Sequence, residues 1–145
     1  MFVENILKQK GHAVLTTVPD RPAADIAREM MEKNIGILLV TDDAGAISGI
    51  ISERDLVRGA AQNDGDISGL KVSDLMTPNV ITCTPADSLQ KITSVMTSKR
   101  VRHLPVLDGK TLRGLISIGD VLKYRLEETL LDEEAMRDYI AGRLY

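Results

Sequence analysis

The segment Gly49-Ile50-Ile51-Ser52-Glu53-Arg54-Asp55 has a counterpart further along the chain, Gly114-Leu115-Ile116-Ser117-Ile118-Gly119-Asp120. Both segments begin with a glycine and a short apolar run, and both end in Ser-x-x-Asp. A short apolar run is typical of a buried strand, and Ser followed three residues later by an acidic residue is typical of a helix start. Each segment is therefore predicted to join a strand to a helix.

Identity between the two halves of the chain extends outward from these junctions. With one deletion in a loop, the matching residues of the first half are Thr16, Pro19, Ile26, Met30, Lys33, Leu38, Val40, Asp42, Gly49, Ile51, Ser52 and Asp55. Their identical partners are Thr82, Pro85, Ile92, Met96, Lys99, Leu104, Val106, Asp108, Gly114, Ile116, Ser117 and Asp120. The chain is a tandem duplication.

Each copy is predicted to run strand, helix, strand, strand, helix. The predicted strands span 14–19, 37–40 and 47–51 in the first copy and 80–85, 104–107 and 112–116 in the second. The first helix of each copy is predicted from apolar residues at helical spacing, which are Ile26, Ala27, Met30 and Met31, and then Leu89, Ile92, Val95 and Met96. We expect Met30, Met31 and Met96 to fill the core.

One copy of about 60 residues buries too little surface to be stable on its own. We therefore expect an α+β fold in which two sheets pack about a pseudo-two-fold axis, with the helices outside. The predicted parts are 1–69 (N-terminal segment and first repeat), 70–128 (second repeat) and 129–145 (helical extension), with a linker at 62–71. The C-terminal stretch carries a spare apolar face that suggests docking on another subunit. Its residues are Leu122, Leu126, Leu130, Met136, Ile140 and Leu144.

Composition excludes several classes of protein. The chain has 145 residues and a net charge of -3, and only 3% of it is aromatic. The four rings, Phe2, Tyr124, Tyr139 and Tyr145, lie near the chain ends, so we expect them at a subunit interface rather than at a ligand. Without basic excess or stacking rings, a nucleic-acid partner is not expected.

Further motifs are missing from the sequence. No apolar run approaches the roughly 18 residues of a membrane span, so we expect a cytoplasmic protein without a membrane partner. The single Cys83 and two histidines argue against a disulfide and a metal site. No catalytic motif is present, so an enzyme is not expected.

The chain resembles the CBS domain, named after cystathionine beta-synthase. The segments that carry the resemblance are the two Ser-x-x-Asp junctions, Val101-Arg102-His103-Leu104-Pro105-Val106 and Leu75-Met76-Thr77. The likeness covers nearly the whole chain and implies a stand-alone CBS pair, or Bateman module. It implies an adenosine ligand, AMP first, with ADP, ATP, NAD or S-adenosylmethionine as further members of the class. It also implies a homodimer of four repeats in a disc and regulation of an unknown partner by conformational change.

The resemblance implies a stronger nucleotide site in the second copy, closed by the segment before the first helix of the other copy. Its residues are Thr16, Thr17, Val18, Ala23, Arg102, His103, Ser117, Gly119 and Asp120. Chemically, the Asp120 carboxylate can accept both ribose hydroxyls, and Ser117 can donate to phosphate. Arg102 and His103 are expected to add charge-assisted contacts.

A weaker site is expected in the first copy, with NAD as a further candidate ligand. Its residues are Gly36, Ile37, Ser52, Arg54, Asp55, Thr82, Cys83 and Thr84, with Leu89 beside them. Gly36 and Ile37 replace Arg102 and His103, so the strand supplies no cation, although Arg54 offers a substitute. The alternative remains that both Ser-x-x-Asp motifs only cap helices and that the protein is an oligomerisation scaffold.

Overall fold

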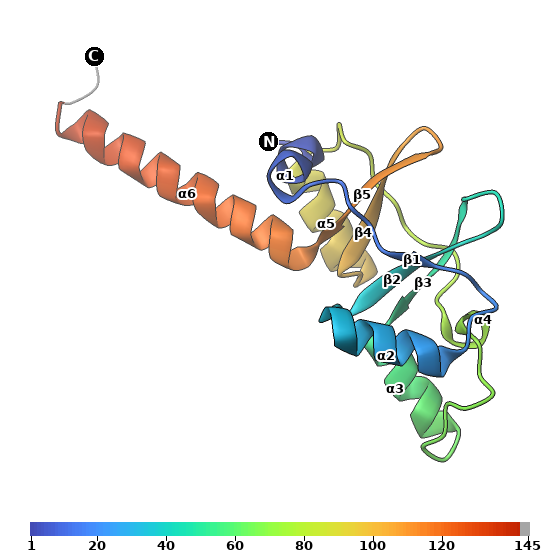
Figure 1. Cartoon of the computed structure of the whole chain (residues 1–145). Helices are drawn as coiled ribbons and strands as arrows, with labels where there is room; N and C mark the ends of the chain where they lie inside the picture. Colours follow the sequence, from blue (N-terminus) through green and yellow to red (C-terminus); the bar gives the residue numbers. More distant parts are fainter. Residues whose placement is uncertain (143–145) are drawn as a thin grey trace. The chain divides into compact units, whose positions relative to one another are not determined.

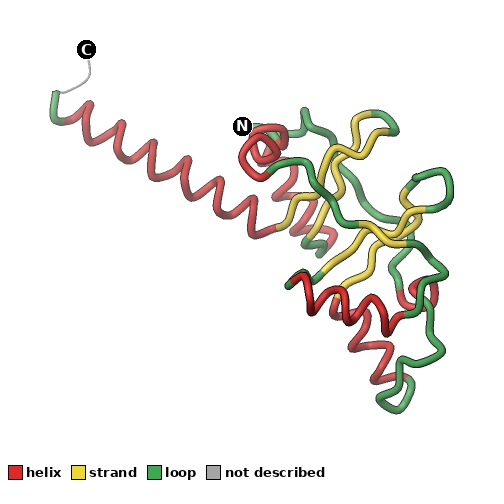
Figure 2. Tube along the Cα trace, viewed as in Figure 1, coloured by secondary structure: helices red, strands yellow, loops and turns green. Residues whose placement is uncertain are grey.

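The structure, a computed structural model, describes residues 1–142 (Figure 1). The chain divides into two compact units. The first-repeat unit is Ala13–Ile81, and the second-repeat unit combines Met1–His12 with the chain from Thr82 onward. Each contains helices and short strands (Figure 2), which confirms the predicted α+β class. The packing of the sheets about a pseudo-two-fold axis stays a prediction.

The first-repeat unit contains a three-stranded sheet in the order β1-β2-β3. Its strands are β1 (Thr16–Thr17), β2 (Ile37–Thr41) and β3 (Ile47–Ser52). β1 is parallel to β2, and β2 is antiparallel to β3. Its helices are α2 (Ala23–Lys33), α3 (Glu53–Gln62) and α4 (Val72–Leu75).

The core of this unit joins all three helices to the sheet. Its buried residues are Ala23, Ile26, Met30, Leu38, Val40, Ile51, Leu56, Val72 and Leu75. Met31 is an exception to the predicted pattern, because its side chain is 78% exposed and belongs to no core. The expectation for Met31 was wrong, since it follows Met30 directly and points about 100° away around the helix.

The second-repeat unit has a sheet of only two strands, β4 (His103–Asp108) and β5 (Thr111–Ser117), which are antiparallel. The strand predicted at 80–85 reduces to a single parallel bridge between Cys83 and Val106. In the first copy, the Leu39 N–H donates to Leu15 O at 3.2 Å. The second copy has Pro105 at the position of Leu39, and proline has no N–H to donate. This proline explains why the pairing is shorter.

Three helices complete the second-repeat unit. They are α1 (Val3–Lys10), α5 (Leu89–Lys99) and α6 (Ile118–Ile140). α6 extends well beyond the repeat, as the sequence predicted, and its apolar stripe is exposed. The described residues of this α6 stripe are Leu122, Leu126, Leu130, Met136 and Ile140. Leu144 and Tyr145, which the sequence analysis also singled out, lie outside the described residues.

The segment before each repeat packs on the other repeat. Leu7 of α1 covers Gly114 of β5, where a Cβ on the glycine would lie 2.6 Å from Leu7 Cδ2. Met76 covers Gly49 of β3 in the same manner, with Sδ 2.7 Å from such a Cβ. The N-terminal helix therefore belongs to the compact unit of the second repeat, whereas the sequence grouped residues 1–69 together.

Candidate functional site

The second Ser-x-x-Asp motif forms a reciprocal cap at the start of α6. The Asp120 N–H donates to Ser117 Oγ at 3.1 Å, and the Ser117 N–H donates to Asp120 Oδ2 at 2.8 Å. Ser52 and Asp55 form the same cap at the start of α3, at 3.3 and 2.8 Å. Both motifs therefore cap helices, and any ligand must use the atoms that capping leaves free.

A lysine from the other end of the unit completes the surroundings of Asp120. Lys10, the last residue of α1, places Nζ 2.7 Å from Asp120 Oδ2 and 2.8 Å from Leu115 O. Oδ2 thus accepts two hydrogen bonds, one from Lys10 and one from the Ser117 N–H. Oδ1 accepts none from the described part of the chain. The half-buried carboxylate is fixed by one oxygen and presents the other.

The matching carboxylate in the first copy has no such free atom. Asp55 Oδ2 accepts from the Ser52 N–H and from the Ser52 hydroxyl, at 2.8 and 3.1 Å. Asp55 Oδ1 accepts from Arg58 Nη2 at 2.6 Å. Only 5% of Asp55 is exposed. The contact with Arg58 was not predicted from the sequence, although a spacing of three residues on a helix brings an Asp and an Arg together.

The surroundings of Asp120 also set protonation states. Burial raises the pKa of Asp120, but the Lys10 ammonium and the Ser117 N–H together outweigh it and hold the pKa below 3.8. Burial lowers the pKa of His103 below 6.5, and Lys10 lowers it further, while Asp120 opposes both. At pH 7 the carboxylate is therefore charged and the imidazole neutral. His103 offers a hydrogen bond there, not the positive charge expected from the sequence.

The helix start keeps few backbone donors for an anion. Besides the two N–H groups used in the cap, the Ile118 N–H donates to Arg102 O at 2.8 Å. The Gly119 N–H, the Ser117 hydroxyl hydrogen and the exposed Arg102 side chain have no hydrogen-bond acceptor in the described chain. A helix start binds anions through free N–H groups, so capping weakens this part of the predicted phosphate site.

The closing segment predicted for this site lies in the first-repeat unit and offers one unusual atom. Thr17 is 5% exposed, and within the described chain its Oγ1 has no hydrogen-bond partner. Thr16 and Val18 are exposed. Ala23 is fully buried in the core of the unit, and its N–H donates to Leu70 O at 2.8 Å. Thr17 is thus the residue of this segment whose buried hydroxyl lacks a hydrogen-bond partner in the described chain.

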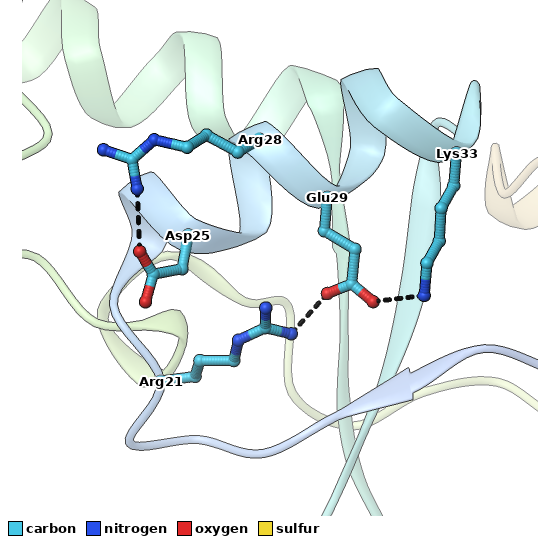
Figure 3. A network of polar contacts seen from close by, with 5 residues as sticks. All are labelled: Arg21, Asp25, Arg28, Glu29 and Lys33. Carbon is cyan, nitrogen blue, oxygen red and sulfur yellow. Dashed lines mark hydrogen bonds and ion pairs between the residues drawn. The ribbon is translucent and has the colours of Figure 1, made fainter.

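A polar network holds the loop between this segment and α2 (Figure 3). Glu29 forms ion pairs with Arg21 of the loop and, at 2.9 Å, with Lys33 of α2. Hydrogen bonds to Lys33 and Arg21 lower the pKa of Glu29, so that its charge persists below pH 4.5. From the other side, the Ser73 N–H donates to Pro19 O at 2.9 Å. The loop is anchored at both of its ends.

The residues predicted for the weaker site offer a phosphate group fewer favourable contacts than those around Asp120. A Cβ on Gly36 would lie 3.5 Å from the carboxyl group of Glu53. Arg54, expected to replace the missing cation for the phosphate, is exposed, and the ion pair with Asp55 is made by Arg58. Ile37 starts β2, while Thr82 and Thr84 are exposed.

Cys83, the remaining predicted contact of the weaker site, lies in the core. It is 5% exposed, and burial raises the pKa of its thiol to about 12. Leu89 beside it is also buried. Cys83 therefore acts as a small apolar residue and not as a nucleophile or ligand donor.

Within residues 1–142, no group of three or more His, Cys, Asp and Glu side chains is arranged to hold a metal ion. None of the helices in this range is both long and apolar enough to cross a membrane.

The chain belongs to the CBS domain family, whose model matches residues 10–61 and 72–127. It is 31% identical over 148 residues to the mitochondrial CBS domain-containing protein CBSX3 of Arabidopsis thaliana, which covers 97% of this chain and 72% of that protein. The family resemblance and the fold class expected from the sequence are thereby confirmed.

Solved structures of CBS-domain proteins have the same fold. The CBS-domain containing protein ATU1752 of Agrobacterium tumefaciens aligns with a TM-score of 0.81 and 40% identity, covering 86% of this chain and 99% of that one. CBSX2 in complex with AMP aligns with a TM-score of 0.72 and 25% identity, covering 88% of this chain and 98% of that one.

Proposed function

We propose that this chain is a regulatory module that binds an adenine nucleotide, with AMP as its preferred ligand. The observation that carries the proposal is the free Oδ1 of Asp120 on a carboxylate that Lys10 and Ser117 hold in place. An ionised carboxylate accepts hydrogen bonds only, which suits a ribose diol. Membership of the CBS family and the AMP complex of CBSX2 support this ligand class.

The proposed site lies at the start of α6 in the second-repeat unit. Asp120 binds the ribose, and the Ser117 hydroxyl and the Arg102 side chain donate further hydrogen bonds to the ligand. Because residues 3–123 contain no aromatic side chain, the adenine is held between aliphatic side chains and by backbone hydrogen bonds.

The proposed activity is regulation and not catalysis. A bound nucleotide shifts the equilibrium between arrangements of the repeats only if it binds one arrangement more tightly, and a partner protein senses that shift. The scaffold alternative assigns Ser117 and Asp120 to capping alone. The free Oδ1 favours ligand binding, because capping uses only the other oxygen.

Isothermal titration of the full chain with AMP tests this proposal. Asp120→Asn keeps the shape of the side chain but removes its charge, and we expect AMP binding to weaken by about 2 kcal/mol, close to thirtyfold in Kd. Asp55→Asn is the matched variant, and we expect a much smaller effect because both of its oxygens are already bonded. Equal effects of the two substitutions, or no heat with wild type at millimolar AMP, would refute the proposal.

We further propose that a second copy of this chain covers the α6 stripe. The first turns of α6 carry Lys123 and Arg125 against one acidic residue, Asp120, whereas acidic residues predominate from Glu127 onward. An antiparallel partner helix places the basic end of each α6 against the acidic part of the other. A parallel partner would oppose acid to acid, so charge favours the antiparallel pair.

A further inference from the structure

The second-repeat unit contains a cavity between α1 and α6 that shares only Asp120 with the predicted site. Its volume is about 170 Å³, and it is lined by Ile6, Gln9, Lys10, Asp120, Lys123 and Tyr124. Pockets that enclose a whole small molecule usually measure about 300–1,000 Å³. At roughly 30 Å³ per water molecule, this cavity accommodates a group of the size of a phosphate.

The charges around the cavity favour an anion. Lys10 and Lys123 face one carboxylate, Asp120, so the lining has a surplus of positive charge. Two of the three N–H donors of Lys10 bond to Asp120 Oδ2 and Leu115 O, and the third remains available to a ligand. Lys123 makes no ion pair with any described residue.

Neutral donors complete the lining. The Gln9 amide and the Tyr124 hydroxyl can each donate a hydrogen bond to a bound oxyanion. Tyr124 was expected away from the ligand, yet it lines the cavity that includes Asp120.

We propose that this cavity binds the phosphate group of the nucleotide whose ribose Asp120 holds, with Lys10 and Lys123 as its cationic ligands. The inference rests on the proposed function and adds the residues that select a phosphorylated ligand. It explains how the site can bind phosphate although the cap has used most N–H groups at the start of α6. Lysine and phosphate form charge-assisted hydrogen bonds, which are stronger than neutral ones.

Titration calorimetry of the full chain with AMP and with adenosine tests the inference, because the two ligands differ only in the phosphate. We expect Lys123→Met to weaken AMP binding about tenfold and to change adenosine binding less than twofold. Lys110→Met is the matched control, since Lys110 is exposed on the turn between β4 and β5 and outside the cavity. We expect it to leave both affinities unchanged.

The outcomes separate this inference from the proposed function. If wild type binds AMP and Lys123→Met leaves that affinity unchanged, or weakens adenosine equally, the phosphate subsite is refuted while nucleotide binding stands. If wild type binds neither ligand, the proposed function fails. In that case the subsite is tested by titrating the protein with inorganic phosphate and following the backbone amide signals of Gln9 and Tyr124 by NMR. If these signals do not shift, the phosphate subsite is refuted as well.

Discussion

Lys10 Nζ lies 2.7 Å from Asp120 Oδ2, which bonds the end of α1 to the start of α6. The same ammonium group also donates to Leu115 O in β5, so α1 is attached to the strand and to the helix that together form the second junction. In the first copy this place belongs to Arg58, which lies on the same helix as Asp55. A ligand that withdraws Lys10 from Asp120 would therefore loosen α1, whereas the first copy has no equivalent connection.

Replacing Lys10 by Met should destabilise the protein by about 1 kcal/mol at pH 7, because the pair is only partly exposed. The folded state lowers the pKa of Asp120, so this carboxylate stabilises the fold above pH 3.8 and loses that contribution as the pH falls through its lowered pKa. The variant should therefore lose less stability than wild type on acidification. Urea unfolding at pH 7 and pH 3 measures both effects.

Lys8→Met is the control for this prediction, because Lys8 is exposed in the same last turn of α1 and forms no ion pair with the described residues. An equal loss in the two variants would show that the Lys10–Asp120 pair contributes nothing specific.

Alanine at the two junction glycines should have unequal effects. A Cβ at Gly49 would lie 2.7 Å from Met76 Sδ and 3.0 Å from the backbone oxygen of Thr77, which hydrogen bonds to Ile50 hold in place. A Cβ at Gly114 meets only the tip of Leu7, which can turn aside. We expect Gly49→Ala to cost about 1–3 kcal/mol and Gly114→Ala less, as measured by thermal unfolding.

Gly119→Ala serves as the control for these substitutions, since its nearest contact, Ser117 Oγ, would be 3.6 Å away and alanine favours a helix. Its melting temperature should stay equal or rise. A larger loss for Gly114→Ala than for Gly49→Ala would contradict the packing argument.

The sequence predicted the parts of this molecule that depend on local pattern. The repeat, both helix starts and the paired strands were found because Ser-x-x-Asp and short apolar runs are signals within a few residues. The contact of Lys10 with Asp120 could not be predicted, because no pattern in α1 indicates which repeat it packs on. The ion pair of Arg58 with Asp55 could have been predicted, because residues three apart on a helix lie side by side. The strand predicted at 80–85 is reduced to one bridge because Pro105 has no N–H to donate to it. This effect could not be predicted without knowing that the two segments are neighbours in the sheet.

Histidine titration gives a prediction with a definite sign. Because the pKa of His103 is lowered in the folded state, protonation favours the unfolded chain. Stability should therefore fall as the pH decreases from about 6.5 toward that lowered pKa, and His103→Gln should remove this part of the loss. Denaturant unfolding between pH 7 and 5 measures it.

His12→Gln, whose ring nitrogen lies 2.8 Å from Arg113 O, is the matched substitution and should leave the His103 contribution in place. NMR titration of the His103 ring follows the same group directly, and addition of AMP should raise its pKa if the phosphate binds nearby. A His103 pKa at or above 6.5 without nucleotide would contradict the structure.

Glutamate in the α6 stripe should separate the proposed pair of helices. Leu126 is 61% exposed within the stripe, and Leu126→Glu would bury a charge against the second copy. Leu131 is equally exposed at 63% but lies about 140° around the helix from Leu126, so Leu131→Glu adds the same charge outside the proposed contact. In light scattering after size exclusion, wild type and Leu131→Glu should have twice the 15.9 kDa chain mass and Leu126→Glu the mass of one chain. A dimer that tolerates Leu126→Glu would place the subunit contact elsewhere, and a monomeric wild type would leave the stripe without a second copy to cover it.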